Sequence, residues 1–154
     1  MPPRRGVAWF TRGGRMKILL RIALVAASLC ATSTALCNEL PGKWMLSIEN
    51  PGHRAVATVV VEFTDEVAPS CMGGEWKVVK VVSASTGDKA FFPVSDPLSY
   101  RIEDGQLTIG RKEVCDAYLW LQGPRGGSSV QGSYFSLGLG GSSPRGYFTL
   151  SQAR

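Results

Sequence analysis

The sequence predicts an all-β protein, folded as a single small antiparallel up-and-down β-barrel of eight or nine short strands. Short runs of alternating apolar and polar residues recur from residue 43 to residue 150, and Gly, Pro, Asn and Asp separate them. No run after residue 37 repeats with the 3.6-residue period of a helix. The first and last runs also match in pattern. Their pairing would close the sheet and remove its exposed edges.

The first strand is expected at residues 42–49 and the last at 146–150. Trp44, Leu46 and Ile48 share one face of the first run, as do Phe148 and Leu150 in the last. Alternation of this kind indicates a strand with one buried side.

The strands between them are inferred in the same way. They are expected at residues 55–63, 76–82, 98–103, 107–109, 114–121 and 129–137. The broken alternation at Val78–Val79 predicts a β-bulge. Asp104-Gly105, between two alternating runs, predicts a two-residue hairpin turn, because both turn positions favour positive φ.

Residues 1–37 have the pattern of a secretory signal peptide, and residues 38–154 are expected to form the barrel. A basic region precedes the apolar run 22–30, and small residues follow it. Met16 is an alternative start, and cleavage after Ala35 or after Cys37 satisfies the small-residue requirement. The apolar run is shorter than the roughly 20 residues of a membrane helix. We therefore expect a periplasmic or secreted protein with no membrane insertion after cleavage.

The leader also explains the basic character of the chain. It contains six of the 17 Lys and Arg residues and none of the 12 Asp and Glu residues. Residues 38–154 therefore carry a formal charge of −1, against +5 for the whole chain. The net charge gives no reason to expect nucleic acid as a partner.

Cys71 and Cys115 are the two cysteines well inside the barrel domain. Export would place them where disulfides persist, so we expect them to be joined. The alternative is a pair of buried free thiols. A disulfide would help a small domain with a modest core.

Both ends of the domain resemble the lipocalins and the wider calycin group. The resemblance rests on Gly42-x-Trp44, on Val130-x-Gly132-x-Tyr134, and on Gly146-x-Phe148-x-Leu150 with terminal Arg154. In that group the Trp closes one barrel end and a late basic residue packs over it. The resemblance therefore implies barrel-closing roles for Trp44 and Arg154. The size is similar to that of exported bacterial barrel proteins that inhibit lysozymes or metalloproteases.

The residues do not suggest catalysis, a cofactor or a metal. His53 is the only histidine of the domain and lies in a Pro-Gly turn. The acidic pairs 65–66 and 103–104 also lie in expected turns, without apolar surroundings to raise a carboxyl pKa. We therefore expect a protein that is not an enzyme.

Recognition of another protein is the function that the sequence favours. Tyr118 and Trp120 share the strand face opposite Cys115, and either they point outward as contact residues or they face the barrel interior. The Gly-rich segments 123–129 and 137–145 are expected to be long loops that carry Arg125 and Arg145. Tight turns are expected in this region, and the run 138–143 is expected to form a flexible hairpin.

These groups form the predicted protein-binding surface of a monomer whose interior is filled by its own side chains. The expected filling residues include Trp44, Phe63, Trp76, Phe91, Leu98, Tyr100, Ile102 and Phe148. The expected partner is an exported or envelope enzyme of the lysozyme-like or proteolytic kind. The alternatives are a carrier of a small apolar ligand and a structural envelope protein.

Overall fold

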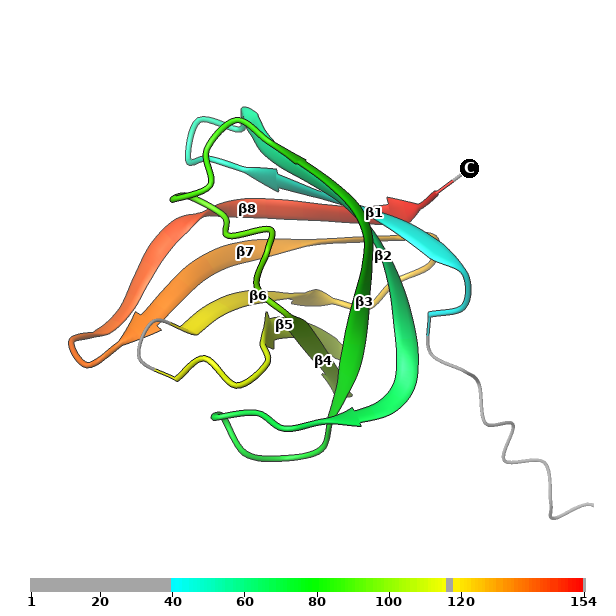
Figure 1. The fold of residues 1–154 in the computed structure, drawn as a ribbon. Helices are drawn as coiled ribbons and strands as arrows, with labels where there is room; N and C mark the ends of the chain where they lie inside the picture. Colours follow the sequence, from blue (N-terminus) through cyan, green and yellow to red (C-terminus); the bar gives the residue numbers. More distant parts are fainter. Residues whose placement is uncertain (1–39, 116–117, 154) are drawn as a thin grey trace, which may run out of the picture. The chain divides into compact units, whose positions relative to one another are not determined.

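The computed structural model describes residues 40–115 and 118–153, so the predicted leader lies outside the described residues. Eight antiparallel strands follow one another around a closed barrel (Figure 1). They are β1 (Lys43–Glu49), β2 (Ala55–Ala68), β3 (Trp76–Thr86), β4 (Leu98–Glu103), β5 (Gln106–Arg111), β6 (Tyr118–Pro124), β7 (Ser129–Gly138) and β8 (Gly141–Gln152). The all-β up-and-down barrel predicted from the sequence is confirmed. Within the described residues there is no helix long and apolar enough to cross a membrane.

Pairing between β1 and β8 closes the barrel. Leu46 lies opposite Leu150, and Ile48 lies opposite Phe148. These are the apolar faces that alternation assigned to the first and last strands. The Asp104-Gly105 turn is also confirmed, with φ of 50° and 74° at its two residues.

Several strands differ from their predicted limits. β2 continues to Ala68 and β3 to Thr86, whereas β6 begins at Tyr118 instead of residue 114. Val60 and Val61 of β2 pair with Ser83 and Val81, so Val82 is an extra residue on β3. Between Phe63 and Val67 the extra residues lie on β2. The predicted bulge on β3 is therefore present, but at Val82 instead of Val78–Val79. Alternation shows that the phase changes along a strand, whereas the pairing partner decides at which residue the extra position falls.

The barrel interior is packed with side chains from all eight strands. Trp44, Phe63, Phe91, Leu98, Tyr100, Ile102 and Phe148, expected to fill it, all belong to one apolar cluster. Trp76 is also buried, but it lies outside this interior cluster. The prediction that Trp76 fills the barrel interior was wrong, because Val79 faces the interior and Trp76, three residues earlier, lies on the outer face of β3.

The two ends of the barrel are closed by different segments. At the end that we call the mouth, where β3 ends and β4 begins, residues 87–97 bring Phe91 and Phe92 against the interior cluster. At the opposite end Trp44 is buried, and its Nε1 donates to the carbonyl of Pro41 at 3.2 Å. Arg154, the predicted partner of Trp44 in closing the barrel, lies outside the described residues.

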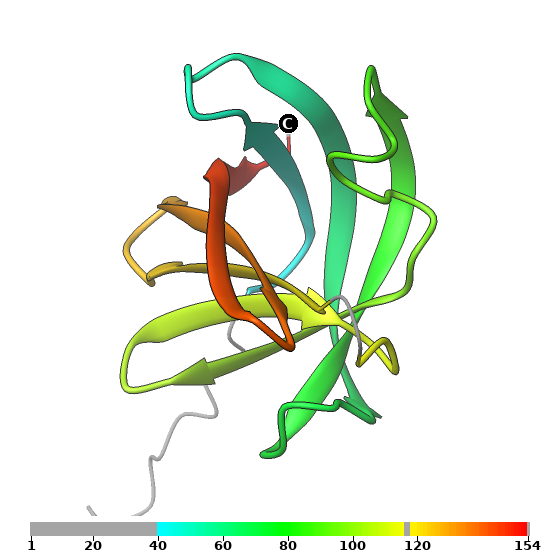
Figure 2. The same cartoon turned by 90° about the vertical axis from the view of Figure 1, so that its left-hand side faces the viewer.

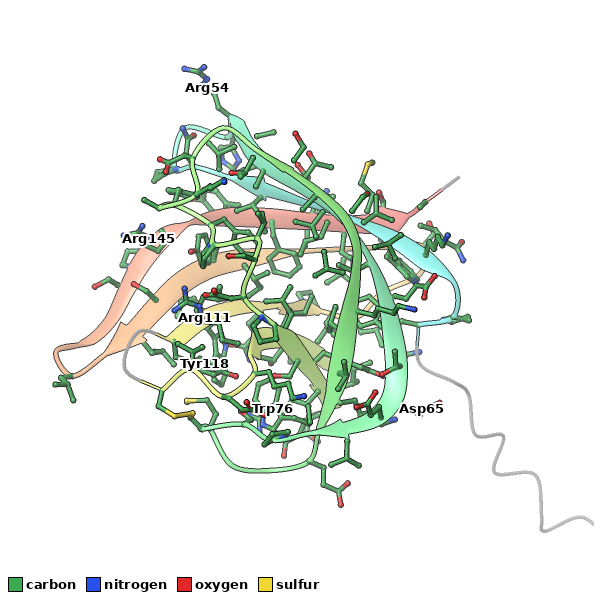
Figure 3. All side chains as sticks on the ribbon, viewed as in Figure 1. Arg54, Asp65, Trp76, Arg111, Tyr118 and Arg145 are labelled. Atoms are coloured by element: carbon green, nitrogen blue, oxygen red, sulfur yellow. A yellow bond between two sulfur atoms is a disulfide. The ribbon has the colours of Figure 1, made fainter. Side chains whose placement is uncertain are left out.

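A disulfide ties one loop to the outside of the barrel. The loop of residues 69–75, which we call the strap, joins β2 to β3, and Cys71 is bonded to Cys115. The predicted disulfide is therefore present in the structure. Ser70 Oγ lies 3.3 Å from the Tyr118 hydroxyl, and Trp76 Nε1 donates to the carbonyl of Gly73. Figure 3 shows the disulfide beside Tyr118 and Trp76.

Candidate protein-binding surface at the barrel mouth

Residues 137–145, expected as a long loop with a flexible hairpin at 138–143, form a β-hairpin with paired strands up to its turn. Pairing of β7 with β8 continues as far as Gly138 opposite Gly141, which leaves a two-residue turn, Leu139-Gly140. Gly141 has a φ of 103°, a conformation that glycine adopts without steric cost. Gly-rich composition indicates flexibility, but here it permits a tight turn. We call residues 136–143 the mouth hairpin.

The mouth hairpin extends past both neighbouring strands. β6 pairs with β7 as far as Leu137, and β1 pairs with β8 from Tyr147 onward. The last part of the hairpin therefore lies beyond its neighbours, as Figure 1 shows for the orange end of β7 and β8. Leu139, at the tip, is fully exposed. A large apolar side chain is thus presented at the projecting tip of the mouth hairpin.

The base of the hairpin is held against the barrel. A Cβ on Gly146 would collide with the carbonyl oxygen of Glu49, so β8 leaves the β1 pairing through a close backbone contact that only glycine allows. One residue earlier, the guanidinium of Arg145 lies over the Phe91 ring, 5.4 Å from its centroid. This cation–π contact joins the hairpin to the segment that covers the mouth.

Tyr134 connects residues 87–97, which we call the mouth segment, to the barrel interior. Its hydroxyl donates to the carbonyl of Phe91 at 2.7 Å, and its ring meets those of Phe91 and Phe92 edge to face. Burial raises the pKa of Tyr134, while the charges of Arg145 and Arg111 act in the opposite direction. The phenol therefore stays protonated at neutral pH and keeps its hydrogen bond to the mouth segment.

Further contacts of charged groups hold the mouth segment in place. Arg111 Nη2 lies 2.6 Å from Asp96 Oδ2, in a pair that is largely buried. Asp88 Oδ1 accepts hydrogen bonds from the backbone N–H groups of Ala90 and Phe91 at 2.9 and 3.0 Å. These contacts hold the mouth segment in a fixed position against the barrel.

The structure separates the residues that the sequence grouped as a binding surface. Arg145 lies at the mouth, whereas Arg125 lies at the other end of β7, where its backbone N–H donates to the carbonyl of Gly105 at 2.7 Å. Residues 125–128 form a short connection between β6 and β7 in place of the expected long loop. A hairpin turn and the preceding turn of an up-and-down barrel necessarily lie at opposite ends.

Tyr118 and Trp120 lie on the outer face of β6, but neither is a freely exposed anchor. Tyr118 is buried beneath the strap, and its strand partner Leu137 places it next to the base of the mouth hairpin. Trp120 is half-buried and stacks on Phe135 with ring centroids 6.0 Å apart. The sequence left open whether these two side chains point outward or into the barrel. They point outward, but the strap covers Tyr118.

An outer aromatic cluster forms around these two residues. Its members are Trp76, Arg101, Tyr118, Trp120 and Phe135. The Arg101 guanidinium lies 5.1 Å from the Trp76 ring centroid and 5.9 Å from that of Trp120. Burial raises the pKa of Tyr118, whereas contacts with Ser70, Ser99 and Arg101 oppose this. The cluster is thus a packed group of aromatic side chains on the outer face of the barrel, separate from the interior cluster.

Sequence reasoning did not single out Leu139, the most exposed apolar side chain of the mouth. The available signal was a lone Leu between glycines in a Gly- and Ser-rich run. A flexible loop and a tight hairpin share that composition, so the exposed tip could be found only from the strand pairing.

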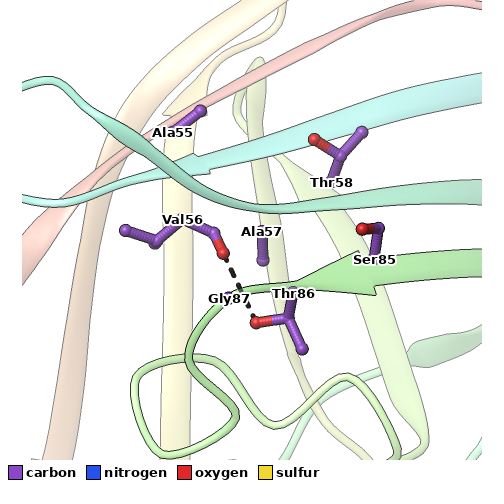
Figure 4. A pocket seen from close by; sticks show the side chains of 7 residues that line it. All are labelled: Ala55, Val56, Ala57, Thr58, Ser85, Thr86 and Gly87. Atoms are coloured by element: carbon purple, nitrogen blue, oxygen red, sulfur yellow. Dashed lines mark hydrogen bonds between the residues drawn. The ribbon is translucent and has the colours of Figure 1, made fainter.

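A shallow depression lies beside the mouth between the start of β2 and the end of β3. It has a volume of about 230 Å³ and is lined by residues 55–58 and 85–87 (Figure 4). Thr86 Oγ1 and the Gly87 N–H both donate to the carbonyl of Val56, at 3.4 and 3.0 Å. None of the lining residues has an ionisable side chain. Within residues 40–115 and 118–153, no three His, Cys, Asp or Glu side chains are grouped as metal ligands would be.

The closed eight-stranded antiparallel barrel is consistent with a calycin-like barrel, the class that the Gly42-x-Trp44 resemblance suggests. Comparison of the chain with models of protein families, with curated proteins and with solved structures gives no match.

Proposed function

We propose that this chain is an exported, calycin-like binding protein that inhibits another exported or envelope enzyme, of the lysozyme-like or proteolytic kind. In this proposal residues 1–37 direct export and are removed, and the protein acts by binding rather than by catalysis. The Cys71–Cys115 disulfide is compatible with an oxidising extracellular compartment, periplasmic or secreted. The observation that carries the proposal is the fully exposed Leu139 at the tip of the projecting mouth hairpin.

The packing of the barrel favours recognition on the outside. A carrier needs an apolar space in the lumen, but large side chains such as Phe92, Tyr100 and Phe148 occupy the interior. An eight-stranded barrel has room for only one small ligand even when it is hollow. The interior cluster therefore supports a binding protein over a carrier of apolar molecules.

The shape of the mouth hairpin suits insertion into a cleft. Its tip is a two-residue turn, and its last strand residues, Gly138 and Gly141, have no side chains to widen it. Apolar side chains that enter a partner's pocket commonly contribute most of the affinity of an interface. Arg145 and Gly146 hold the base of the hairpin, so the entropy cost of ordering on binding falls on its glycine-rich tip.

The direct test is inhibition of purified lysozyme-like enzymes and proteases by the oxidised protein and by two single variants. Leu139→Ser should weaken inhibition by at least about tenfold, the size of effect expected for a central apolar contact. Val67→Ser removes another exposed apolar side chain, from β2, and should leave inhibition unchanged. Equal inhibition by the two variants would exclude the mouth hairpin as the part of the protein that contacts the enzyme.

A second measurement addresses the carrier. The protein is titrated with an apolar fluorescent dye, and the change in dye emission is compared with that for a Leu46→Ala variant, which opens space in the lumen. Little dye should bind to the unaltered barrel. Strong dye binding by the unaltered protein, together with no inhibition of any enzyme, would contradict the inhibitor proposal and favour a carrier of small apolar ligands.

A further inference from the structure

Strands β6, β7 and β8, over the ranges that the structure describes, contain a single charged residue. It is Arg145, and its guanidinium lies over the Phe91 ring at the mouth. Each of β1 to β5, by contrast, contains at least one Lys, Arg, Asp or Glu. Figure 2 shows β6, β7 and β8 side by side on the left of the barrel. Their outward side chains therefore form one continuous surface without charge.

The strand pairing identifies the side chains that share this surface. Leu121, Tyr134 and Phe148 belong to the interior cluster, so the residues on either side of them along each strand point outward. Pairing between the strands arranges these outward residues in two rows. The first row is Trp120 and Phe135, and the second is Gln122, Ser133 and Tyr147. We call these five residues, together with Gln131 on β7, the uncharged face.

The uncharged face offers aromatic rings beside neutral hydrogen-bonding groups. Trp120 and Phe135 are both half-buried, and their rings are nearly parallel, with an angle of 26° between the planes. Tyr147 is 40% exposed, and the polar side chains of Ser133 and Gln131 are exposed beside it. A strand spacing of about 4.8 Å places Trp120 and Tyr147, two strands apart, about 10 Å from each other across the sheet.

Contacts within the protein fix these groups in place. Gln122 Oε1 accepts a hydrogen bond from Trp120 Nε1 at 3.3 Å, so the amide N–H groups of Gln122 remain as donors. His53 stacks on Tyr147 with ring centroids 4.3 Å apart. The imidazole is in turn held by Glu49, whose Oε2 lies 3.2 Å from His53 Nδ1. A ligand therefore meets groups that are already ordered, which lowers the entropy cost of binding.

The chemistry of the uncharged face favours a neutral ligand with hydroxyl groups. A charged ligand is disfavoured, because the charges that border the face, Arg101 and Glu49, have partners within the protein. An apolar ligand would bury Ser133 and Gln131 without hydrogen bonds, which costs free energy. A saccharide has an apolar C–H face that packs on an aromatic ring, and hydroxyl groups that exchange hydrogen bonds with hydroxyls and amides. It matches both kinds of group on this surface.

We propose that the uncharged face binds a neutral oligosaccharide. One sugar ring packs against Trp120 and Phe135, and a second packs against Tyr147. Gln122 and Ser133, in the row of Tyr147, exchange hydrogen bonds with the hydroxyl groups of the sugar. The inference is independent of the proposed inhibitory function, because the mouth hairpin and its Leu139 are not part of the uncharged face.

The test is NMR spectroscopy of the oxidised, isotopically labelled protein with three neutral probes, the tetramers of glucose, mannose and N-acetylglucosamine. At millimolar concentration at least one probe should shift amide signals of β6, β7 and β8 and leave those of β2 and β3 unchanged. Leu139→Ser should bind that probe with an unchanged Kd, which separates this proposal from the inhibitory one. The absence of shifts on the three strands with every probe would overturn the proposal.

Substitutions on the face locate the sugar. Tyr147→Ala should raise the Kd by at least about tenfold, and Tyr147→Phe, which keeps the ring, should raise it less. Ser133→Glu should also weaken binding by at least about tenfold, because the new carboxylate loses water beneath the sugar. Val82→Ser is the matched control, since Val82 on β3 is 43% exposed, and it should leave the Kd unchanged.

Two results would contradict the assignment of the ligand. Tighter binding of an anionic tetramer, such as that of galacturonic acid, than of any neutral probe would show that the face does not select against charge. Signal changes on β6, β7 and β8 caused by an inhibited enzyme, but by none of the sugars, would make the face a protein contact instead. Unfolding midpoints of the Tyr147 and Ser133 variants close to that of the unaltered protein, expected for exposed positions, exclude loss of the fold as the cause of weaker binding.

Discussion

At the scale of single residues, Gly110 shows how the outer aromatic cluster depends on the barrel beneath it. A Cβ at position 110 would collide with the ring and hydroxyl of Tyr118. The Tyr118 side chain thus packs directly against the β5 backbone at Gly110, and the strap closes over it. Glycine usually weakens a strand. Here its missing side chain is the space that an aromatic ring occupies.

Gly110→Ala should therefore destabilise the protein by about 1–3 kcal/mol, because the added methyl group overpacks a buried site. Urea denaturation measures the change in the free energy of unfolding. Gly126→Ala is the matched control, since nothing lies within 4 Å of its Cβ position, and its stability should stay close to that of the unaltered protein. Equal stabilities of the two variants would mean that Tyr118 moves away without cost.

At the scale of elements, the strap and the mouth hairpin are both additions to a barrel that is complete without them. The interior cluster draws on β1 to β8 and includes no strap residue. The strap instead covers the outer aromatic cluster, and the disulfide anchors it 44 residues further along the chain. We expect substitutions in either element to leave the packing of the barrel core unchanged.

Replacing both Cys71 and Cys115 by Ser should lower the free energy of unfolding by about 4 kcal/mol in the chain-entropy model, and keep the far-ultraviolet spectrum of a β-barrel. The freed strap should expose Trp76 and shift its fluorescence to longer wavelength. A Trp120→Phe background isolates that signal from the neighbouring indole. Unchanged emission from Trp76 would show that Ser70 and Gly73 hold the strap without the disulfide.

At the scale of the whole molecule, two buried phenols link stability to alkaline pH. Burial raises the pKa of Tyr118 outside the barrel and of Tyr134 inside it. The folded protein therefore retains these protons at a pH where the unfolded chain, with a tyrosine pKa of about 10, has lost them. Their contribution is complete below pH 10, and it falls as the pH rises toward the pKa values of the folded state.

The free energy of unfolding, measured by urea denaturation between about pH 8 and pH 11, should fall more steeply above pH 10 than in a Tyr134→Phe variant. The variant is less stable at neutral pH, because it loses the hydrogen bond to the Phe91 carbonyl. Tyr147→Phe, at an exposed position, is the control and should follow the unaltered protein. The same dependence of the unfolding free energy on pH in all three proteins would contradict a contribution from the buried Tyr134 phenol.

The sequence by itself determined the strands that have a simple two-faced pattern. Trp44, Leu46 and Ile48 alternate strictly, and the structure places all three in the interior. Closure between first and last strands and the Cys71–Cys115 bond also followed from pattern and cysteine count. These features depend on local alternation or on residue type, which a sequence displays directly.

Only the tertiary structure decided what covers each face and where each strand loses its neighbour. Tyr118 points outward and is still buried, because a strap from a distant part of the chain crosses over it. The Gly-rich segment around Leu139 became a hairpin because β7 and β8 pair beyond β6 and β1. Alternation distinguishes two faces of a strand, but the cover on a face and the length of a pairing come from residues far away in sequence.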